Sequence, residues 1–322
     1  MTKKRRLGKT DIEITPIGLG CWQFSQGSKG MSAVWDAVNQ ETINGIVDTA
    51  LKGGISWFDT AELYGRGTSE QTLAKALTAA GVRPGQVVVA TKWWPLARRA
   101  RSIEATIDTR LSCLSPFPID LYQVHQPFSV SSVAAQMKAM ARILKAGKIR
   151  SVGVSNFSAR RMELAHAALA AEGIVLASNQ MRFNLLDRGI ERNGVLSSAK
   201  KLGVTIIAWS PLAQGVLTGR FHDDPAAAAK VSTMRRMMNG FSAARLAKSA
   251  PLIEEMRVIG RAHGASVAQV ALCWETSFHG ETVVAIPGAT KKAQAEQSAG
   301  AMGFALTATE LSRIDELSKA AR

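Results

Sequence analysis

The chain alternates short apolar runs with stretches of helical periodicity, and this alternation constrains its fold more than any other feature. The runs at 87–90, 121–124 and 206–209 are mainly apolar throughout instead of at every second position. Such strands must be covered on both faces, as in a parallel sheet with helical crossovers. Eight such units in 322 residues predict an α/β fold, a (β/α)8 TIM barrel forming a single domain over 1–322. The alternative, an open doubly wound sheet, is disfavoured because no Gly-x-Gly-x-x-Gly joins a first strand to a helix.

Additions to the barrel are expected at its start and after its seventh strand. Residues 5–15 predict an N-terminal β-hairpin with its turn at 8–11. The interval between the seventh strand and the last one, at 283–286, is long, so we expect a long loop at 212–249 that acts as a lid. That loop contains Gly215, Gly219, Gly240, Arg220, Lys230, Arg235 and Arg236. Among the helices, Thr68 with Gln71 predicts a capping box and Ser158 predicts an N-cap.

Polar or aromatic residues end successive apolar runs at a regular interval. Asp59, Lys92 and His125 are 33 residues apart in turn, and Ser155, Gln180 and Trp209 end the runs that follow. The carboxyl ends of all strands in a (β/α)8 barrel open on one face, where such barrels carry their chemistry. We therefore expect these side chains to line one site.

The stretch 57–67 combines a carboxylate with a phenol, because Asp59 ends the strand and Tyr64 follows in a glycine-rich loop. A tyrosine has an ordinary pKa of about 10, and a nearby ammonium group such as that of Lys92 would lower it. A buried ammonium in turn needs a counter-ion, which Asp59 could provide. Taken singly, these residues and His125 have simpler structural explanations. At the ends of successive strands, they indicate a proton-transfer site.

Composition argues against several other classes of protein. The net charge of +15 would suit nucleic acid, but the basic residues are spread along the chain, and an anionic cofactor also favours a basic surface. The three cysteines and five histidines show no metal-type spacing, so we expect no metal site. No run of apolar residues is long enough for a membrane span, and the basic start lacks the apolar core of a secretory signal. We therefore expect a cytoplasmic protein with a small-molecule partner; its oligomeric state is open.

The strand-end residues stand in seven motifs that resemble the aldo-keto reductase family along nearly the whole chain. These motifs are Phe58-Asp59-Thr60-Ala61 with Tyr64-Gly65, Ala90-Thr91-Lys92, Val124-His125-Gln126-Pro127, Gly153-Val154-Ser155-Asn156-Phe157, Asn179-Gln180, Trp209-Ser210-Pro211-Leu212 with Gly215, and Ile286-Pro287-Gly288-Ala289. The sub-pattern is similar to a bacterial branch that also includes potassium-channel beta subunits and pyridoxal reductases. The resemblance implies NADPH-dependent reduction of aldehydes or ketones to alcohols.

The resemblance also implies roles for individual residues. Tyr64 would be the general acid, with Lys92 and Asp59 tuning its pKa, and His125 would orient the carbonyl. The implied cofactor-binding residues are Trp22, Asp59, Ser155, Asn156, Gln180, Trp209, Ser210, Pro211, Leu212, Gln214, Gly215, Arg220, Gly288, Ala289, Thr290, Lys291, Gln294, Gln297 and Ser298.

The adenine end of the implied cofactor site departs from the family pattern. The family often has a basic residue in place of Thr290 and Glu-Asn in place of Gln297-Ser298, whereas Gln294 keeps the pattern. A helix starting near Lys291 would present its N-terminus to the adenosine 2′-phosphate. NADPH is the expected cofactor, and NADH remains possible.

Substrate recognition is expected from aromatic residues that follow strand ends. An apolar rim would suit aldehydes, aromatic or of medium chain length, better than charged sugars; its predicted members are Trp22, Phe24, Trp93, Trp94 and Phe128. Two other functions remain open. One is an NADPH-binding regulatory or sensing subunit with slow or no turnover. The other is a Schiff-base lyase using Lys92, which the adjacent Asp59 and the missing phosphate motif disfavour.

Overall fold

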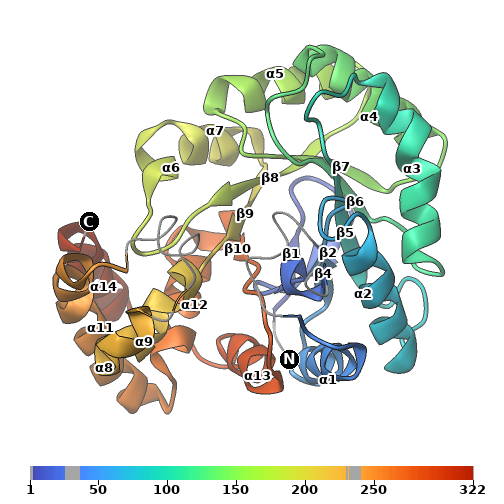
Figure 1. Ribbon diagram of the computed structural model, residues 1–322. Coiled ribbons are helices and arrows are strands. Elements are labelled where there is room, and N and C mark those ends of the chain that lie inside the picture. The colour runs from blue at the N-terminus through green and yellow to red at the C-terminus, as the bar shows by residue number, and fades with distance from the viewer. Residues whose placement is uncertain (1–2, 26–36, 230, 232–240, 322) are drawn as a thin grey trace.

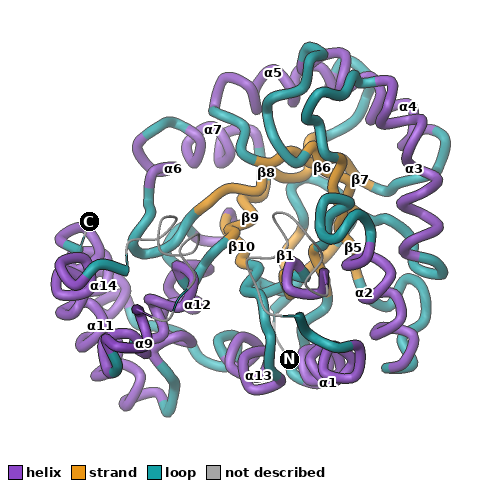
Figure 2. The backbone as a smooth tube through the Cα atoms, viewed as in Figure 1, coloured by secondary structure: helices purple, strands orange, loops and turns teal. Residues whose placement is uncertain are grey.

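A computed structural model describes residues 3–25, 37–229, 231 and 241–321. Eight parallel strands hydrogen-bond in chain order and lie inside a ring of helices (Figures 1 and 2). The strands are β3 (Leu19–Gly20), β4 (Trp57–Asp59), β5 (Val88–Trp93), β6 (Leu121–Val124), β7 (Ser151–Ser155), β8 (Leu176–Arg182), β9 (Thr205–Trp209) and β10 (Val283–Ala285).

The first and last strands meet, which closes the sheet into a barrel. Gly18 N donates to the carbonyl oxygen of Ala285 at 2.9 Å, and Gly20 N donates to that of Pro287 at 3.0 Å. Parallel bridges between Ile17 and Ala285 and between Gly20 and Gly288 continue the ladder across this seam. The predicted (β/α)8 barrel is therefore confirmed.

Most of the strands are apolar on both faces because they contribute to two separate cores. Trp57, Ala90 and Leu121 belong to a small cluster inside the barrel, whereas their neighbours Phe58 and Val89 belong to the large cluster between strands and helices. Alternation along a strand sends successive side chains to opposite faces. The interior positions of β4 and β5 therefore continue from Trp57 and Ala90 to Asp59 and Lys92.

The N-terminal hairpin, predicted at 5–15, closes the end of the barrel opposite those polar residues. It consists of β1 (Arg5–Arg6) and β2 (Glu13–Ile14), paired antiparallel. Leu7 and Ile14 join the inner cluster, and the indole Nε1 of Trp57 donates to the carbonyl oxygen of Thr15 at 2.9 Å. The barrel therefore has a packed floor, which leaves its carboxyl end for ligands.

The helices that cover the barrel follow the strands in the expected alternation. They are α1 (Gln40–Lys52), α2 (Thr68–Ala79), α3 (Arg101–Leu114), α4 (Val133–Lys145), α5 (Ala159–Ala170), α6 (Gly189–Arg192), α7 (Val195–Leu202), α12 (Val267–Ser277), α13 (Lys292–Gly300) and α14 (Ala308–Ala320). Short 3₁₀ turns lie at Trp22–Ser25 and Gly280–Thr282.

Of the two predicted caps, one is confirmed and the other is wrong. Ser158 Oγ accepts from Arg161 N at the start of α5. At α2, however, Thr68 is already helical, and the N-cap is Gly67, whose φ of 97° places it in the left-handed region. Thr68 Oγ1 instead donates to the carbonyl oxygen of Gly65 at 2.7 Å, so no capping box forms with Gln71.

The long segment predicted as a loop at 212–249 contains helices in its described part. These are a 3₁₀ helix at Ala213–Thr218, α8 (Arg220–Asp223), α9 (Pro225–Ala229) and the start of α11 (Ala243–His263), which packs against α12 and α14. Lys230, Arg235, Arg236 and Gly240 lie outside the described residues. The insertion begins directly at the mouth of the barrel, beside the end of β9.

Candidate active site

The carboxyl end of the barrel holds a cavity of about 630 Å³, within the size range of small-molecule sites. Asp59, Ser155 and Trp209 reach it from the last residues of β4, β7 and β9, and His125 reaches it from the position after β6. The predicted strand-end residues therefore converge, because alternation sends each of them to the barrel side of its strand.

Lys92 and Asp59 form a buried ion pair at the base of this cavity. Lys92 is fully buried and Asp59 is 1% exposed. The Lys92 Nζ donates to Asp59 Oδ1 and to the carbonyl oxygen of Thr60, the latter at 2.7 Å. Burial alone would lower the pKa of Lys92, but the negative charge of Asp59 and its hydrogen bond outweigh that effect, so the pKa is raised. Lys92 is therefore positively charged at neutral pH.

The second oxygen of Asp59 is held by two glutamines from other strands. Gln180 Nε2 donates to Oδ2 at 2.9 Å and Gln123 Nε2 donates to it at 3.1 Å. Gly153 makes room for Gln123, because a Cβ atom at position 153 would lie 2.9 Å from the Cγ of Gln123 and 2.4 Å from Ser178 Oγ. Sequence reasoning missed Gln123, although an amide within an otherwise apolar strand was a usable indication.

Tyr64 lies in the loop after β4, beside the ammonium group. The Lys92 Nζ is 5.2 Å from the centroid of its ring, and the Trp22 ring stacks on it at a centroid distance of 6.1 Å. Burial raises the pKa of the phenol above 10, and the charge of Lys92 offsets only part of that rise. The sequence-based expectation of a net lowering was therefore wrong, because it ignored desolvation. The phenol is protonated at neutral pH.

His125 is buried against two aromatic rings and carries no charge at neutral pH. Burial, together with the nearby charge of Lys92, holds its pKa well below the ordinary value of 6.5. The rings of Trp94 and Tyr64 meet it edge-on, at centroid distances of 5.2 and 5.7 Å. Its Nδ1 is buried and has no hydrogen-bond partner among the described residues. A neutral imidazole here can orient a polar group without adding charge.

Next to His125, four residues that line the cavity are linked by hydrogen bonds. Trp209 Nε1 donates to Asn156 Oδ1 at 3.1 Å, and Asn156 Nδ2 donates to Ser155 Oγ at 3.1 Å. Ser155 Oγ in turn donates to the carbonyl oxygen of Gln180 at 3.0 Å. Asn156 holds a left-handed φ of 59°, an uncommon conformation that recurs at functional sites.

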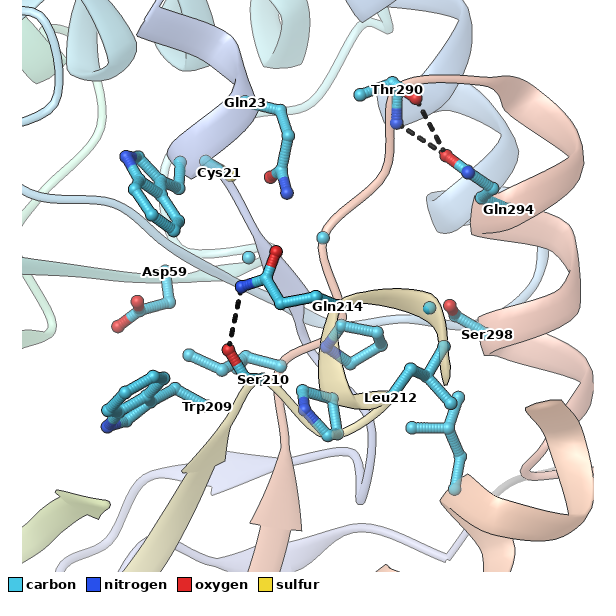
Figure 3. Close-up of a pocket in the computed structure, with 18 of the residues that line it drawn as sticks. Cys21, Gln23, Asp59, Trp209, Ser210, Leu212, Gln214, Thr290, Gln294 and Ser298 are labelled. Carbon is cyan, nitrogen blue, oxygen red and sulfur yellow. Dashed lines mark hydrogen bonds between the residues drawn. The ribbon is translucent and has the colours of Figure 1, made fainter. Parts of the chain in front are cut away.

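Backbone strain is concentrated in the loop after β9. Ser210, Ala213 and Gln214 all have positive φ, at 54°, 47° and 58°, and Gly215 follows at 100°. Figure 3 shows this loop along one side of the cavity, with Gln214 Nε2 donating to Ser210 Oγ at 3.3 Å. Successive left-handed residues turn backbone N–H groups toward a common concavity, which suits an anion.

The far end of the cavity is lined by uncharged residues at the start of α13. Gln294 Oε1 accepts from Thr290 N at 2.7 Å and from Thr290 Oγ1 at 3.1 Å, which holds the turn before the helix (Figure 3). Gln297 and Ser298 also line this end, whereas Ala289 and Lys291 do not. Gly288 lies against Gln23, because a Cβ atom at position 288 would be 2.4 Å from that amide.

Three members of the predicted aromatic rim do not line the cavity. Trp93 and Phe24 are fully buried in the large core. Trp93 follows Lys92 directly, so alternation points it outward to the helices, where its Nε1 donates to Ser102 Oγ at 3.0 Å. Phe128 is 47% exposed and touches the Trp94 ring at a centroid distance of 5.6 Å without reaching the cavity. Trp22 and Trp94 do line it.

The remaining lining residues include several that sequence reasoning did not select. Those are Gly20, Cys21, Gln23, Leu63, Gln126, Thr218, Phe221, Ser266, Ala268, Leu272, Ile286 and Pro287. Gln126, Ile286 and Pro287 stand inside motifs already quoted, so their spacing was an available indication. Ser266, Ala268 and Leu272 lie at or in α12, which follows the insertion in the chain and packs back against it. No local sequence pattern identifies them as lining residues.

Membrane-spanning helices and clusters of metal ligands are both absent from the described residues. Every helix in the described ranges is too short or too polar to cross a membrane. No group of three or more His, Cys, Asp or Glu side chains among these residues is placed to hold a metal ion.

Comparisons with known proteins agree with this geometry. The model of the aldo/keto reductase family matches residues 16–319. An uncharacterised oxidoreductase of Mycobacterium tuberculosis is 34% identical over 310 residues, which cover 96% of this chain and 91% of that protein. A Klebsiella pneumoniae aldo/keto reductase crystallised with NADP and acetate has a TM-score of 0.75 at 25% identity, covering 98% of this chain and 95% of its own. A glycerol dehydrogenase from Gluconobacter oxydans has a TM-score of 0.78 at 26% identity, covering 98% and 94%. The chain belongs to the aldo/keto reductase family.

Proposed function

We propose that this oxidoreductase reduces aldehydes or ketones to alcohols with NADPH, using Tyr64 as the general acid. The observation that carries the proposal is a protonated phenol and a neutral histidine that line one cavity, with the charged Lys92 buried directly beside the phenol. That cavity continues past the strained loop after β9 to α13, which gives it the extended form that a dinucleotide needs. The Klebsiella relative, crystallised with NADP, supports the choice of cofactor.

The residues present fit the cofactor in chemical type. Asn156, Ser155 and Gln180 offer amide and hydroxyl groups for the nicotinamide carboxamide, with Trp209 as a stacking surface. The Nε2 of Gln180 already donates to Asp59, so its oxygen is the atom left for the carboxamide. The backbone of 210–215 and Arg220 suit the pyrophosphate, and Thr290, Gln294, Gln297 and Ser298 suit the adenosine. When bound, NADPH supplies the hydride.

The chain itself supplies the proton and the electrostatic field. As the carbonyl is reduced, negative charge grows on its oxygen, and the phenol of Tyr64 transfers a proton to that oxygen. The Lys92 ammonium stabilises the resulting phenolate, and Asp59 keeps Lys92 charged and in place. The neutral His125 contributes a polar group that fixes the angle of the carbonyl without raising the charge of the site. Trp22, Leu63 and Trp94 exclude water on the substrate side.

We further propose that the chain folds as one domain and works in the cytoplasm. All three cysteines are free thiols in the structure, as a reducing compartment would leave them.

Steady-state oxidation of NADPH with a panel of aldehydes tests the proposed function. Tyr64→Phe should lower kcat at least a hundredfold, since general acid catalysis contributes about 10²–10⁴-fold. NADPH affinity, followed by quenching of tryptophan fluorescence, should change little. Tyr122→Phe is the matched control, because Tyr122 is the other tyrosine of the chain and is fully buried in the outer core. NADPH binding without turnover of any aldehyde would favour the sensing subunit and refute the enzyme.

A further inference from the structure

Behind the substrate side of the cavity, Arg98 joins three loops that each carry a residue of the active site. Arg98 lies in the loop between β5 and α3, which also carries Trp94. The loop after β4 carries Tyr64, and the loop after β6 carries His125. Neither Arg98 nor its partner Glu62 lines the cavity. The mechanism above therefore does not use them, although both are largely withdrawn from solvent, with side chains 26% and 11% exposed.

Glu62 connects the first two loops with a single carboxylate. Its Oε1 accepts from Arg98 Nη1 and from the backbone N of Trp94. Glu62 stands two residues before Tyr64, so the loop with the phenol is fastened to the loop with Trp94. The other carboxylate oxygen lies 4.0 Å from Arg110 Nε, which brings a second positive charge to it.

Arg98 makes three further donor contacts within its own loop and helix α3. Nη1 donates to the carbonyl oxygen of Trp94 at 3.1 Å, Nε donates to Ser102 Oγ at 3.1 Å, and Nη2 donates to Thr106 Oγ1 at 2.9 Å. The guanidinium also lies over the Trp93 ring at 5.4 Å. A lysine could keep the charge but not this planar set of contacts.

The third loop is attached through the backbone groups of Arg98 and Ala100. Ser129 Oγ donates to the carbonyl oxygen of Arg98 at 3.0 Å, and Ala100 N donates to Ser131 Oγ at 3.0 Å. Between Trp94 and Arg98, Ala97 holds a left-handed φ of 55°, a conformation that persists only where the surroundings enforce it. The loop between β5 and α3 is thus held in a conformation that it would not favour alone.

We propose that Glu62 and Arg98 act as a loop clamp: they are positioning residues that hold Trp94 against His125 and the Tyr64 loop against both. This inference rests on the proposed function. The clamp sets the width of the substrate side of the cavity, so its loss matters most for a substrate that touches Trp94. A displacement of about 1 Å at reacting groups can cost on the order of a hundredfold in rate.

The test compares Arg98→Met, Arg98→Lys and Glu62→Gln with a matched control, Arg142→Met. Arg142 also pairs with a glutamate, Glu104, at 2.6 Å, but on the exposed surface between α4 and α3. Amide hydrogen exchange of peptides covering 60–67 and 93–100 reports whether the loops loosen. Values of kcat and KM for benzaldehyde and propanal report the consequence for catalysis, and tryptophan quenching reports the Kd for NADPH.

We expect Arg98→Met to speed exchange in both loops and to lower kcat for benzaldehyde about tenfold, with a change of less than threefold for propanal. The Kd for NADPH should stay within twofold, because the clamp lies away from Trp209 and α13. Arg98→Lys should recover part of kcat. Glu62→Gln, which is isosteric, should lower kcat for benzaldehyde in the same way, and it provides the test if Arg98→Met folds poorly. Exchange and kcat no different from Arg142→Met would overturn the loop clamp. A wild-type protein that reduces no aldehyde would refute the proposed function instead, and the exchange data would still decide whether the clamp exists.

Discussion

Replacing Asp59 by Asn tests whether the buried ion pair is the basis of the site. The substitution removes the charge of Asp59 and leaves a side chain of similar shape. Lys92 would then remain fully buried, with the carbonyl oxygen of Thr60 at 2.7 Å as its other acceptor. An uncompensated buried ammonium is costly, and the protein can avoid that cost only by releasing the proton.

The magnitude follows from the burial of both groups. Removing one partner of a buried pair costs about 3–5 kcal/mol, so the free energy of unfolding at pH 7 should fall by about 3 kcal/mol or more. In the wild type the folded pKa of Lys92 is raised, so its contribution to stability is present at neutral pH and is lost as pH rises through that pKa. In Asp59→Asn burial dominates, the folded pKa falls below the unfolded value, and the penalty is present at neutral pH. The difference between the two proteins should therefore shrink toward pH 10, at up to about 1.4 kcal/mol per pH unit.

Urea unfolding of the two proteins at pH 7 and at pH 9.5 measures this difference. Asp48→Asn is the matched control, because Asp48 pairs with Lys52 at 2.7 Å on the surface of α1, where both side chains are exposed. An exposed pair of this kind is worth about 0.3–0.5 kcal/mol on a helix. A loss for Asp59→Asn below about 1 kcal/mol at pH 7, or a loss independent of pH, would show that Lys92 is not a buried cation and would refute the reasoning.

Three other expectations concern buried groups. Glu275 is 1% exposed, its carboxylate oxygens have no hydrogen-bond partner among the described residues, and burial raises its pKa well above the ordinary value. Its presence therefore destabilises the protein increasingly as pH rises above about 4.3, so Glu275→Gln should flatten the stability profile between pH 5 and pH 7, and Glu13→Gln at an exposed position should not. Because the pKa of His125 lies well below 6.5, kcat/KM should show no ionisation of a histidine between pH 6 and pH 8; an inflection there that His125→Gln removes would contradict this. Trp93→Ala should cost about 3–5 kcal/mol of stability, whereas Trp94→Ala should mainly raise KM for aromatic aldehydes, measured by urea unfolding and steady-state kinetics.

The order of strands was predictable because their composition is determined by burial on both faces. The boundaries of strands were less predictable: the apolar run Ile174-Val175-Leu176 predicts a strand, but β8 starts only at Leu176. Ile174 N still donates to the carbonyl oxygen of Leu169, closing the turn after α5, and Val175 is 40% exposed. An apolar run indicates that a strand is present, but it does not show at which residue the preceding turn ends and the strand begins.

Within the site, the sequence identified side chains better than their directions. The sequence marks three adjacent residues, Lys92, Trp93 and Trp94, but they lie in different environments. Lys92 lies inside the barrel, Trp93 in the outer core and Trp94 at the cavity. The direction of the shift in the pKa of Tyr64 was equally inaccessible. It depends on the balance between desolvation and the charge of Lys92, and only the depth of the cavity decides that balance.

Asp59 is contacted by side chains from several strands of the barrel, and these contacts explain how a barrel can hold a buried ion pair in place. Its two oxygens accept from Lys92 on β5, Gln123 on β6 and Gln180 on β8, so four strands fix one carboxylate. These contacts hold the carboxylate in one orientation beside the fully buried ammonium group of Lys92. Under the proposed function, the phenol of Tyr64, protonated and adjacent to a fixed positive charge, would be the group that gives its proton to the substrate oxygen.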